Sequence, residues 1–360
     1  MSYAARLARL GERLEGLGVD ALLITHLTNV RYLTGYTGSN GAVVARRDGA
    51  VFLTDFRYLE RVEPLREFIE VRQANQDLIG FIAGRWAELA PSAATVGFEA
   101  AHLSVSRHAA LVGAAGEVAL VATNGVVEEL RLVKDDGEIE LIRRAAAMLE
   151  PIYAALVEEG LIGRSEFDVA WRIHQLVREQ GGDGVAFDPI VASGEAGALP
   201  HAEPRRLAIE AGGMVTIDLG AKLDGYCSDC TRTFALGTPP PELEEVYQLV
   251  LQAQQAGLAA VRPGVAGVDA DALVRRIIAE AGHGDHFQHG TGHGVGLDIH
   301  EDPRLSTTST ATLEPGMIVT VEPGVYLPGV GGVRIEDLVV VTADGCQPLT
   351  GYPKQLITAG

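Results

Sequence analysis

The stretch of this sequence that decides the fold is the segment Phe287-Gln-His-Gly-Thr-Gly-His-Gly-Val-Gly-Leu-Asp-Ile-His-Glu301. It places His289, His293 and His300 within twelve residues, with several glycines between them. Glycine lets the backbone turn tightly or come close to a ligand. A single histidine is more often a packed or surface residue than a ligand. Three histidines in one short glycine-rich segment favour a site that binds a ligand.

A fourth histidine and four acids extend this pattern to other parts of the chain. His201 follows a proline in the stretch Leu199-Pro-His-Ala. The acids lie in otherwise apolar stretches typical of β-strands, and they are Asp218, Asp229, Glu322 and Glu336. Taken alone, each acid is explained as the solvent-facing residue of an amphipathic strand, because side chains alternate between the two faces. Four buried carboxylates repel one another and are costly unless cations neutralise them. The set as a whole therefore predicts a metal site.

The C-terminal part of the chain, 129–360, shows a repeated order of expected elements. Each half should contain two helices followed by a strand-rich stretch that carries two of the acids. The expected helices are 137–159 and 165–180 in the first half, and 242–260 and 269–282 in the second. Each acid pair should lie on one hairpin, with turns at Lys222-Leu-Asp-Gly and Pro328-Gly-Val-Gly-Gly. Two such hairpins packed face to face would point four carboxylates into one cavity.

The N-terminal part, 1–128, is predicted to be an α/β domain. Its first residues, 3–17, have the apolar spacing of an amphipathic helix. Short apolar runs flanked by glycine or polar residues predict strands at 21–25, 41–45, 50–54, 94–99 and 118–121. Strands separated by helical stretches indicate a sheet with helices packed on it. The domain boundary is expected shortly before the helix that begins near Asp135, whose first turn is acidic.

The composition excludes several classes of function. The chain has 29 Lys and Arg against 48 Asp and Glu, and its formal net charge is −19. This charge argues against nucleic acid or an anionic membrane as a partner. The chain contains no run of about 18 or more apolar residues, so we expect no membrane span. Arg6 and Arg9 interrupt what would be the apolar core of a signal peptide. Three cysteines are too few for a disulfide framework in 360 residues, so we expect a cytoplasmic protein.

Taken together, these residues resemble the pita-bread metallopeptidases, a family that includes methionine aminopeptidase, aminopeptidase P and prolidase. The family's five metal ligands match, in type, order and local context, Asp218, Asp229, His293, Glu322 and Glu336. Residues 1–128, with the segment Thr28-Asn-Val-Arg-Tyr-Leu-Thr-Gly-Tyr-Thr-Gly, are similar to the creatinase-type N-terminal domain of the proline-specific members. Methionine aminopeptidases lack that domain. The resemblance covers the whole chain and implies an α/β N-terminal domain followed by an α+β pita-bread catalytic domain with a pseudo-two-fold repeat.

The resemblance also implies how the five ligands share two metal ions. Asp229 and Glu336 would bridge both ions, Asp218 would complete one site, and His293 with Glu322 would complete the other. Four carboxylates and one imidazole suit Mn²⁺, with Co²⁺ or Zn²⁺ as alternatives. A hydroxide that bridges the two ions would be the nucleophile, because paired metals lower the pKa of a shared water and polarise the carbonyl.

Catalytic roles follow from the same resemblance. His201 and His300 match the family's outer catalytic histidines, which would hydrogen-bond the substrate and the tetrahedral intermediate. Glu322 would accept the proton of the bridging water. His289 is expected to line the pocket. Arg334 has two readings of equal weight, an orienting partner of a metal-bound carboxylate or a surface cation.

The substrate class is expected to be short proline-containing peptides. The segment His300-Glu-Asp-Pro-Arg304 resembles the prolidase-type segment whose arginine pairs with the substrate carboxylate. Arginine suits this task because its planar fork binds a carboxylate through two hydrogen bonds. We therefore favour an Xaa-Pro dipeptidase, while a surface charge is the other interpretation of Arg304. Aminopeptidase P, which acts on longer Xaa-Pro peptides, shares all five ligands and is the alternative.

Two other classes and the assembly complete the expectations. A metal-free creatinase-like hydrolase does not need the five ligands, and a non-catalytic binding module of this fold would have lost several of them. Both therefore rank below the peptidase. In this family the N-terminal domain of a neighbouring subunit often closes the site, so the resemblance implies a homodimer.

Overall fold

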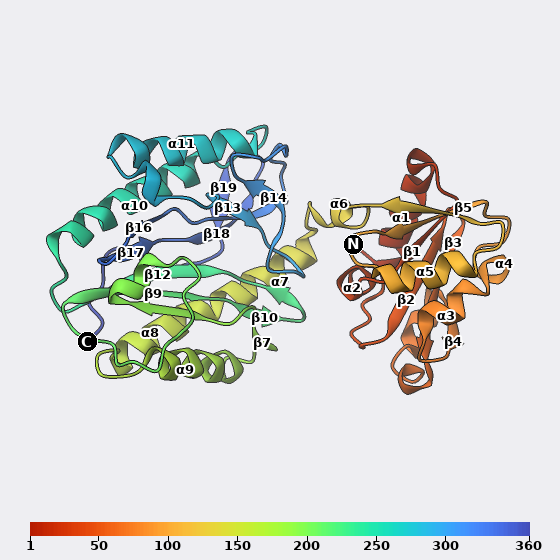
Figure 1. Ribbon diagram of the computed structural model, residues 1–360, viewed down its shortest axis with the longest axis horizontal. Helices are drawn as coiled ribbons and strands as arrows, with labels where there is room; N and C mark the ends of the chain where they lie inside the picture. The colour runs from red at the N-terminus through yellow and green to blue at the C-terminus, as the bar shows by residue number, and fades with distance from the viewer. The chain divides into compact units, whose positions relative to one another are not determined.

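The computed structural model describes residues 1–360 and divides the chain into two compact units, Met1–Arg131 and Leu132–Gly360. Figure 1 shows the first unit in red to yellow and the second in yellow to blue. Each unit has its own sheets and its own hydrophobic core. No helix of the chain is long and apolar enough to cross a membrane.

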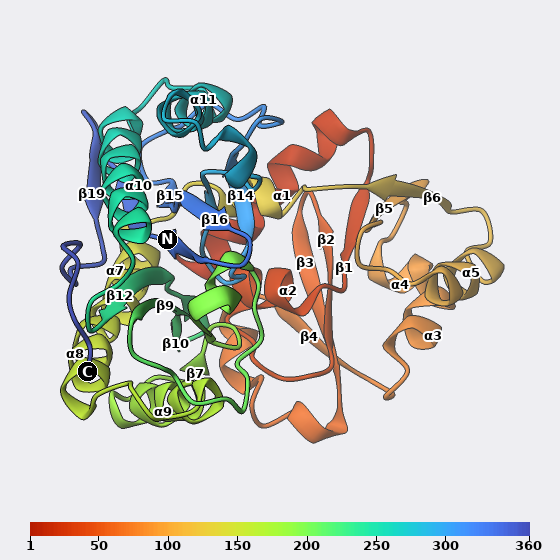
Figure 2. The ribbon, with the colours of Figure 1, turned by 60° about the vertical axis from the view of Figure 1, so that its left-hand side comes forward.

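The N-terminal unit is built on one mixed six-stranded sheet. Its strands are β1 (Ala21–Ile24), β2 (Gly41–Arg46), β3 (Gly49–Asp55), β4 (Glu70–Ala74), β5 (Thr95–Glu99) and β6 (Ala119–Thr123). They run in the order β4-β3-β2-β1-β5-β6, and β1 to β4 lie side by side in Figure 2. The β1–β2 and β2–β3 pairs are antiparallel, while β3–β4, β1–β5 and β5–β6 are parallel.

Helices cover this sheet. They are α1 (Tyr3–Leu17), α2 (Leu27–Thr34), α3 (Leu78–Ala83), α4 (Trp86–Leu89), α5 (Val105–Gly113) and α6 (Glu128–Arg131), with the 3-10 helices η1 (Phe56–Tyr58) and η2 (Glu63–Glu67). Helix α1 begins at Ser2, whose side chain accepts a hydrogen bond from the Ala5 amide, and ends at Gly18 in the left-handed region. Apolar side chains of α3, α4 and α5 share one core with side chains of the strands.

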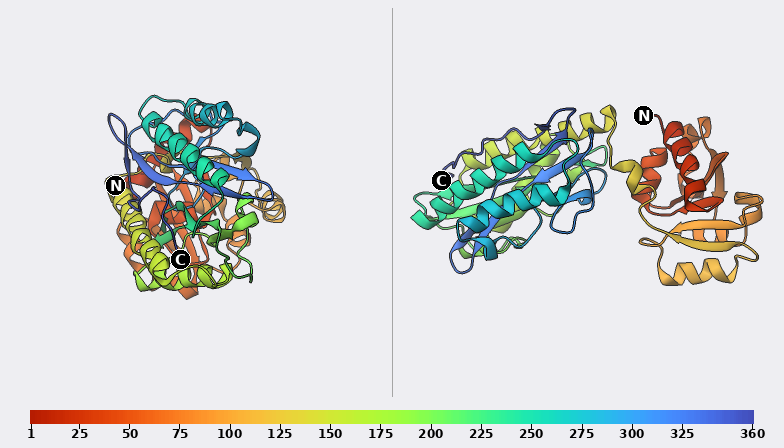
Figure 3. Two further views of the ribbon diagram at one scale, coloured as in Figure 1. Left: turned by 90° about the vertical axis from the view of Figure 1, so that its left-hand side faces the viewer. Right: turned by 90° about the horizontal axis from the view of Figure 1, so that it is seen from above.

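The C-terminal unit contains five helices and four small sheets. Its helices are α7 (Asp136–Ala147), α8 (Leu149–Glu159), α9 (Glu166–Glu179), α10 (Pro241–Ala260) and α11 (Gly267–Glu280), with the 3-10 helices η3 (Gly194–Ala198) and η4 (Gly284–His286). In Figure 1, α8 and α9 lie below the strands of this unit and α10 and α11 lie above them. Figure 3 shows that α10 and α11, which contact each other, run along the strands.

The strands of this unit divide between the two halves of the repeat. The first half has β7 (Gly184–Val185), β8 (Ile190–Ser193), β9 (Gly213–Leu219), β10 (Ala221–Leu223), β11 (Tyr226–Cys227) and β12 (Cys230–Leu236). The second half has β13 (Gly292–Gly294), β14 (Glu301–Leu305), β15 (Ile318–Val321), β16 (Gly324–Leu327), β17 (Gly331–Arg334), β18 (Asp337–Val341) and β19 (Cys346–Pro348). The sheets have the orders β11-β10-β7, β12-β9-β8, β14-β13-β15-β18-β19 and β16-β17. The expected order of two helices followed by strands thus occurs twice.

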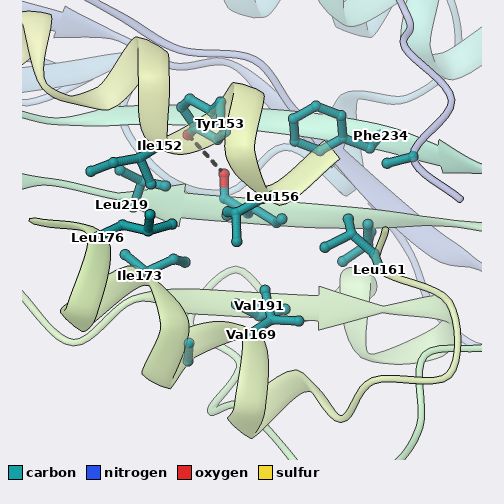
Figure 4. Packing of buried hydrophobic residues seen from close by; sticks show 14 of the residues in the cluster. Ile152, Tyr153, Leu156, Leu161, Val169, Ile173, Leu176, Val191, Leu219 and Phe234 are labelled. Atoms are coloured by element: carbon teal, nitrogen blue, oxygen red, sulfur yellow. Dashed lines mark hydrogen bonds between the residues drawn. The ribbon is translucent and has the colours of Figure 1, made fainter. Parts of the chain in front are cut away.

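The core beneath the first half is shown in Figure 4, where side chains of α8 and α9 pack on those of β8, β9 and β12. Tyr153 lies in it, fully buried, and its hydroxyl donates to the carbonyls of Ile217 and Cys230 at 3.2 and 2.7 Å. The hydroxyl is therefore satisfied despite burial, and it ties α8 to both strands of the β9–β12 ladder. This ladder carries the first acid pair, so the core fixes the position of these two acids.

Candidate metal centre

The four acids lie at corresponding places in two strand ladders. Asp218 lies on β9, and Asp229 directly precedes β12, the strand that pairs with β9. Glu322 directly follows β15, and Glu336 directly precedes β18, the partner of β15. In each half an inner hairpin, β10–β11 or β16–β17, separates the two acids. The expected turns are present, but the acids lie on the outer ladders, where each inner hairpin begins and ends.

Direct hydrogen bonds join the two ladders beside the acids. The amide of Glu336 donates to the carbonyl of Thr231 at 3.1 Å. The Thr231 hydroxyl donates to Oε2 of Glu336 at 2.7 Å. Because Thr231 belongs to β12 and Glu336 lies next to β18, these bonds bring acids from both halves into one place.

His293 reaches this place on the short strand β13, between β14 and β15. The strands are so close that a Cβ atom at Gly292 would lie 1.9 Å from the Thr320 carbonyl oxygen, and one at Gly294 would lie 2.3 Å from that of Asp302. Only glycine fits at these two positions. The glycines on either side of His293 are therefore required by the close packing of the strand that presents it.

One cavity of about 550 Å³ collects all ten residues expected at the site. They come from both halves of the C-terminal unit and are His201, Asp218, Asp229, His289, His293, His300, Arg304, Glu322, Arg334 and Glu336. Asp229, His293 and Glu336 are buried, Asp218, His289 and Glu322 are partly buried, and His201, His300 and Arg304 are exposed. The cavity thus has an acidic, buried floor and an exposed rim of histidine and arginine.

Uncompensated negative charge is strongly unfavourable among the acids at the bottom of the cavity. Burial, together with repulsion from Glu336 and Asp218, raises the pKa of Asp229 well above its ordinary value. Burial, with repulsion from Glu322 and Asp218, does the same to the pKa of Glu336. Burial also raises the pKa of Glu322 to about 7. These carboxylates therefore need protons or bound cations.

His293 has a neutral imidazole ring, the form that binds a metal ion. Burial lowers the pKa of His293 to about 3, so its ring is neutral near pH 7. Its Nδ1 lies 3.0 Å from the Gly294 carbonyl oxygen, which accepts the Nδ1 proton and leaves Nε2 with a free lone pair. Nε2 lies 3.3 Å from Oε1 of Glu322 and 3.5 Å from Oδ2 of Asp229. A single ion between these atoms would contact all three side chains.

Arg334 is a buried member of the site, not a surface cation. Its side chain is only 4% exposed, and its Nη2 lies 2.8 Å from Oδ2 of Asp218. The guanidinium also donates to the hydroxyls of Thr231 and Tyr326, each at 3.0 Å. The first of the two readings of Arg334 therefore agrees with its surroundings.

Tyr326 was missed by sequence reasoning. Its hydroxyl lies 2.8 Å from Nε2 of His289 and accepts from Arg334. Burial, with the nearby Arg334, lowers the pKa of His289 to about 4, so this ring is neutral as well. The sequence shows Tyr326 only as a tyrosine on the inner hairpin, four residues after Glu322. No distinctive pattern around it marks it as a site residue.

Three apolar residues of the cavity lining, which we call the apolar wall, were also missed, because two of them lie in one short segment and the third lies far along the chain, with no common motif. Phe187, Ile190 and Ile299 line the same cavity as the acids and the outer histidines. Ring contact between His293 and His300, with centroids 4.4 Å apart, places His300 beside the expected ligand. The cavity therefore combines polar, charged and apolar surfaces, as sites for small ligands usually do.

The donor set fits two divalent ions. Oδ1 of Asp218 and Oε1 of Glu336 are buried and have no hydrogen-bond partner, which is costly unless an ion contacts them. Asp229, His293 and Glu336 each offer a ligand atom within 4.8 Å of the others. Two dications would balance four carboxylates, and carboxylate with imidazole is a common donor set for hard or borderline ions.

Family comparisons agree with both units. Residues 140–343 match the model of metallopeptidase family M24, and residues 6–133 match the creatinase/prolidase N-terminal domain. A Bacillus subtilis peptidase, YqhT, is 44% identical over 341 residues, which cover 95% of this chain and 96% of that protein.

Solved structures agree with the fold over nearly the whole length. An Xaa-Pro dipeptidase from Bacillus anthracis is 40% identical with a TM-score of 0.96, covering 99% of this chain and 100% of that one. An X-Pro aminopeptidase from Thermotoga maritima is 34% identical with a TM-score of 0.87, covering 96% and 99%. The predicted fold class and the predicted family are confirmed, and the family implies a dinuclear metal site. The chain is a metallo-exopeptidase that belongs to metallopeptidase family M24, with a creatinase/prolidase N-terminal domain before its pita-bread catalytic domain.

Proposed function

We propose that this peptidase is an Xaa-Pro dipeptidase whose dinuclear centre is held by Asp218, Asp229, His293, Glu322 and Glu336. The observation that carries the dipeptide preference is the position of Arg304 on the wall of the cavity that contains these ligands. The similarity to the Bacillus anthracis Xaa-Pro dipeptidase supports the same conclusion.

Asp229 and Glu336 would each contact both ions, which accords with their burial at the join between the two ladders. Asp218 would serve one ion, and His293 with Glu322 the other. Two bound ions would supply an acidified water as nucleophile and would polarise the scissile carbonyl. Mn²⁺ is our proposal for the ion, with Co²⁺ and Zn²⁺ as alternatives to be compared on the metal-stripped protein.

The protein groups around the ions would handle the proton and the developing charge. Glu322 would accept the proton of the attacking water, since its Oε1 lies on the cavity floor and accepts from Thr320. His201 and His300, on the rim, would donate hydrogen bonds to the substrate and to the oxygen that becomes negative in the transition state. Each such donor is worth about 3 to 4 kcal/mol in other enzymes.

Arg304 would bind the carboxylate of the substrate's proline. Its side chain is 45% exposed, and its nearest acid, Asp302, is 4.0 Å away, so its donors are not used in a close ion pair. A dipeptide has its carboxylate next to the scissile bond, whereas a longer peptide has an amide there. The apolar wall formed by Phe187, Ile190 and Ile299 would receive the proline ring.

The test is a comparison of Ala-Pro with Ala-Pro-Ala on the purified, Mn²⁺-loaded protein. We expect the dipeptide to have the larger kcat/KM. A larger kcat/KM for the tripeptide would reject the dipeptidase in favour of aminopeptidase P activity.

We also propose that the chain forms a homodimer. Large apolar side chains lie exposed on the C-terminal unit, and Trp171, Leu199 and Leu207 are each 58–61% exposed. Exposed apolar surface often marks a protein contact. Sedimentation of the active protein tests this, and an active monomer would contradict it.

A further inference from the structure

Helix α11 carries an ion pair with a buried carboxylate and a partly exposed guanidinium, and the pair lies outside the cavity. Asp271 has no exposed surface, and its Oδ1 and Oδ2 lie 2.9 and 3.1 Å from Nη2 and Nε of Arg275, one turn later. Burying the Asp271 carboxylate is costly unless it is paired and the remaining donors and acceptors of the pair are also satisfied. Those further contacts all go to the segment that leads into His293.

Asp271 holds the backbone of Thr291, two residues before His293. Its Oδ1 accepts from the Thr291 amide at 3.0 Å and from the Thr291 hydroxyl at 2.9 Å. The backbone carbonyl of Thr291 accepts from the Glu322 amide at 2.8 Å. Thr291 therefore joins Asp271 on one side to Glu322 on the other.

Arg275 holds the rest of the segment. Its Nη1 donates to the Phe287 carbonyl and its Nη2 to the His289 carbonyl, each at 2.8 Å. The guanidinium carbon lies 4.5 Å from the centre of the Phe287 ring, in a cation–π contact. The chain from Phe287 to Thr291 is thus held at three carbonyl or amide positions by two side chains of one helix.

We propose that the Asp271–Arg275 pair is a positioning device for one of the two metal ions, the ion served by His293 and Glu322. This inference rests on the ligand assignment in the proposed function. The pair does not touch the ion; it fixes the backbone that presents both of its private ligands. Groups that orient metal ligands in this way typically change metal affinity about 10- to 100-fold when they are mutated.

The first half of the repeat offers a matched control. Glu166 on α9 is also fully buried, accepts from the amide and hydroxyl of Ser193 at 2.8 and 2.7 Å, and pairs with Arg205 at 2.7 Å. This pair is chemically alike, but it holds Ser193 and the loop after His201, and no metal ligand directly. Variants at either site therefore lose the ion pair of a buried carboxylate, but only Asp271 contacts the segment that leads into a proposed ligand.

The experiment measures Mn²⁺ binding to the metal-stripped full chain, with free Mn²⁺ followed by electron paramagnetic resonance. The variants are Asp271→Asn, Arg275→Lys and the control Glu166→Gln, and thermal unfolding without metal shows which of them are folded. We expect two ions on the wild type. In Asp271→Asn one ion should keep its wild-type Kd and the other should bind about 10- to 100-fold more weakly, with Arg275→Lys showing the same selectivity. Glu166→Gln should bind both ions as the wild type does.

The variants test the positioning role, and the wild type tests the ligand assignment. Wild-type affinity for both ions in Arg275→Lys and in folded Asp271→Asn would overturn the positioning role. Equal weakening of both ions, or the same weakening in Glu166→Gln, would also overturn it, because that pattern indicates general loosening. Should Asp271→Asn fail to fold, Arg275→Lys decides, since it keeps the positive charge beside Asp271. Fewer than two ions on the wild type would instead reject the five-ligand centre, and the inference with it.

Discussion

Arg334, which is buried, and Asp218, which is partly buried, form an ion pair across the two halves of the catalytic unit, with 2.8 Å between Nη2 and Oδ2. Arg334 comes from the inner hairpin of the second half and Asp218 from the outer ladder of the first. The pair engages one oxygen of the carboxylate and leaves Oδ1 without a hydrogen-bond partner. A carboxylate held in this way is oriented for an ion at its second oxygen.

Replacing Arg334 by lysine should therefore reduce activity although the charge is kept. The lysine ammonium cannot reproduce the planar fork that contacts Asp218, Thr231 and Tyr326 together. We expect kcat/KM for Ala-Pro at saturating Mn²⁺ to fall by about tenfold or more, as for the loss of one charge-assisted hydrogen bond. Arg276→Lys, on the exposed face of α11, is the control and should match the wild type. Equal activity of the two variants would show that the fork does not orient Asp218.

Metal should stabilise the protein by relieving repulsion among the buried acids. An ion present at 100 times its Kd contributes about 2.7 kcal/mol, so Mn²⁺ should raise the Tm and a chelator should lower it. Asp229→Asn removes one of the mutually repelling carboxylates and one proposed ligand. Without metal, this variant should unfold at or above the wild-type Tm, and Mn²⁺ should raise its Tm less. A full Mn²⁺-induced rise in Asp229→Asn would argue against Asp229 as a ligand.

Arg304→Ala should change substrate preference more than stability. The side chain is 45% exposed and makes no close ion pair, so the fold loses little. A hydrogen bond to a charged group contributes about 1.5–3 kcal/mol, which corresponds to roughly a 10- to 100-fold decrease in kcat/KM for Ala-Pro. Ala-Pro-Ala has no carboxylate at that position and serves as the internal control, with an expected change of less than about threefold. A parallel loss on both substrates would assign Arg304 a different role.

The Glu166–Arg205 pair should make stability depend on pH. Burial alone would raise the pKa of Glu166, but hydrogen bonds from Arg205 and Ser193 outweigh it and lower the pKa below its ordinary value of 4.5. A lowered folded-state pKa means that the ionised form stabilises the fold above pH 4.5 and that this contribution is lost as the pH falls further.

Urea unfolding of the wild type and Glu166→Gln measures this contribution. The wild type should be the more stable of the two at pH 7, and the difference should shrink as the pH falls below 4.5. A difference that stays constant over this range would mean that the Glu166 charge does not contribute.

Short apolar runs and the helical spacing of apolar residues made much of this architecture predictable. The strands expected near 21–25, 41–45, 50–54, 94–99 and 118–121 are all present with small changes at their ends. The helix expected at 137–159 is divided at Met148 into α7 and α8. Strand β4, Glu-Val-Arg-Gln-Ala, was not predicted, because its composition is largely polar and it contains no apolar run.

The candidate site was predictable where chemistry is concentrated in short segments. The acids and histidines stand out because charged or titratable groups are unusual within apolar or glycine-rich stretches. Tyr326, Asp271 and the wall residue Phe187 did not stand out, since each is a common residue in an ordinary context. Their importance arises from contacts between segments distant in the sequence, such as the hydrogen bond between Asp271 and Thr291. The local sequence pattern does not reveal such contacts.

The division of each acid pair by an inner hairpin has a consequence for biosynthesis. Of the five proposed ligands the first ladder supplies only Asp218 and Asp229, and the last in chain order, Glu336, directly precedes β18. A nascent chain that has completed only the first half therefore offers two of the five proposed ligands. The complete set of proposed ligands is assembled only when the second half has been synthesised and has docked on Thr231. Binding of both ions would thus report that both halves of the catalytic unit have folded.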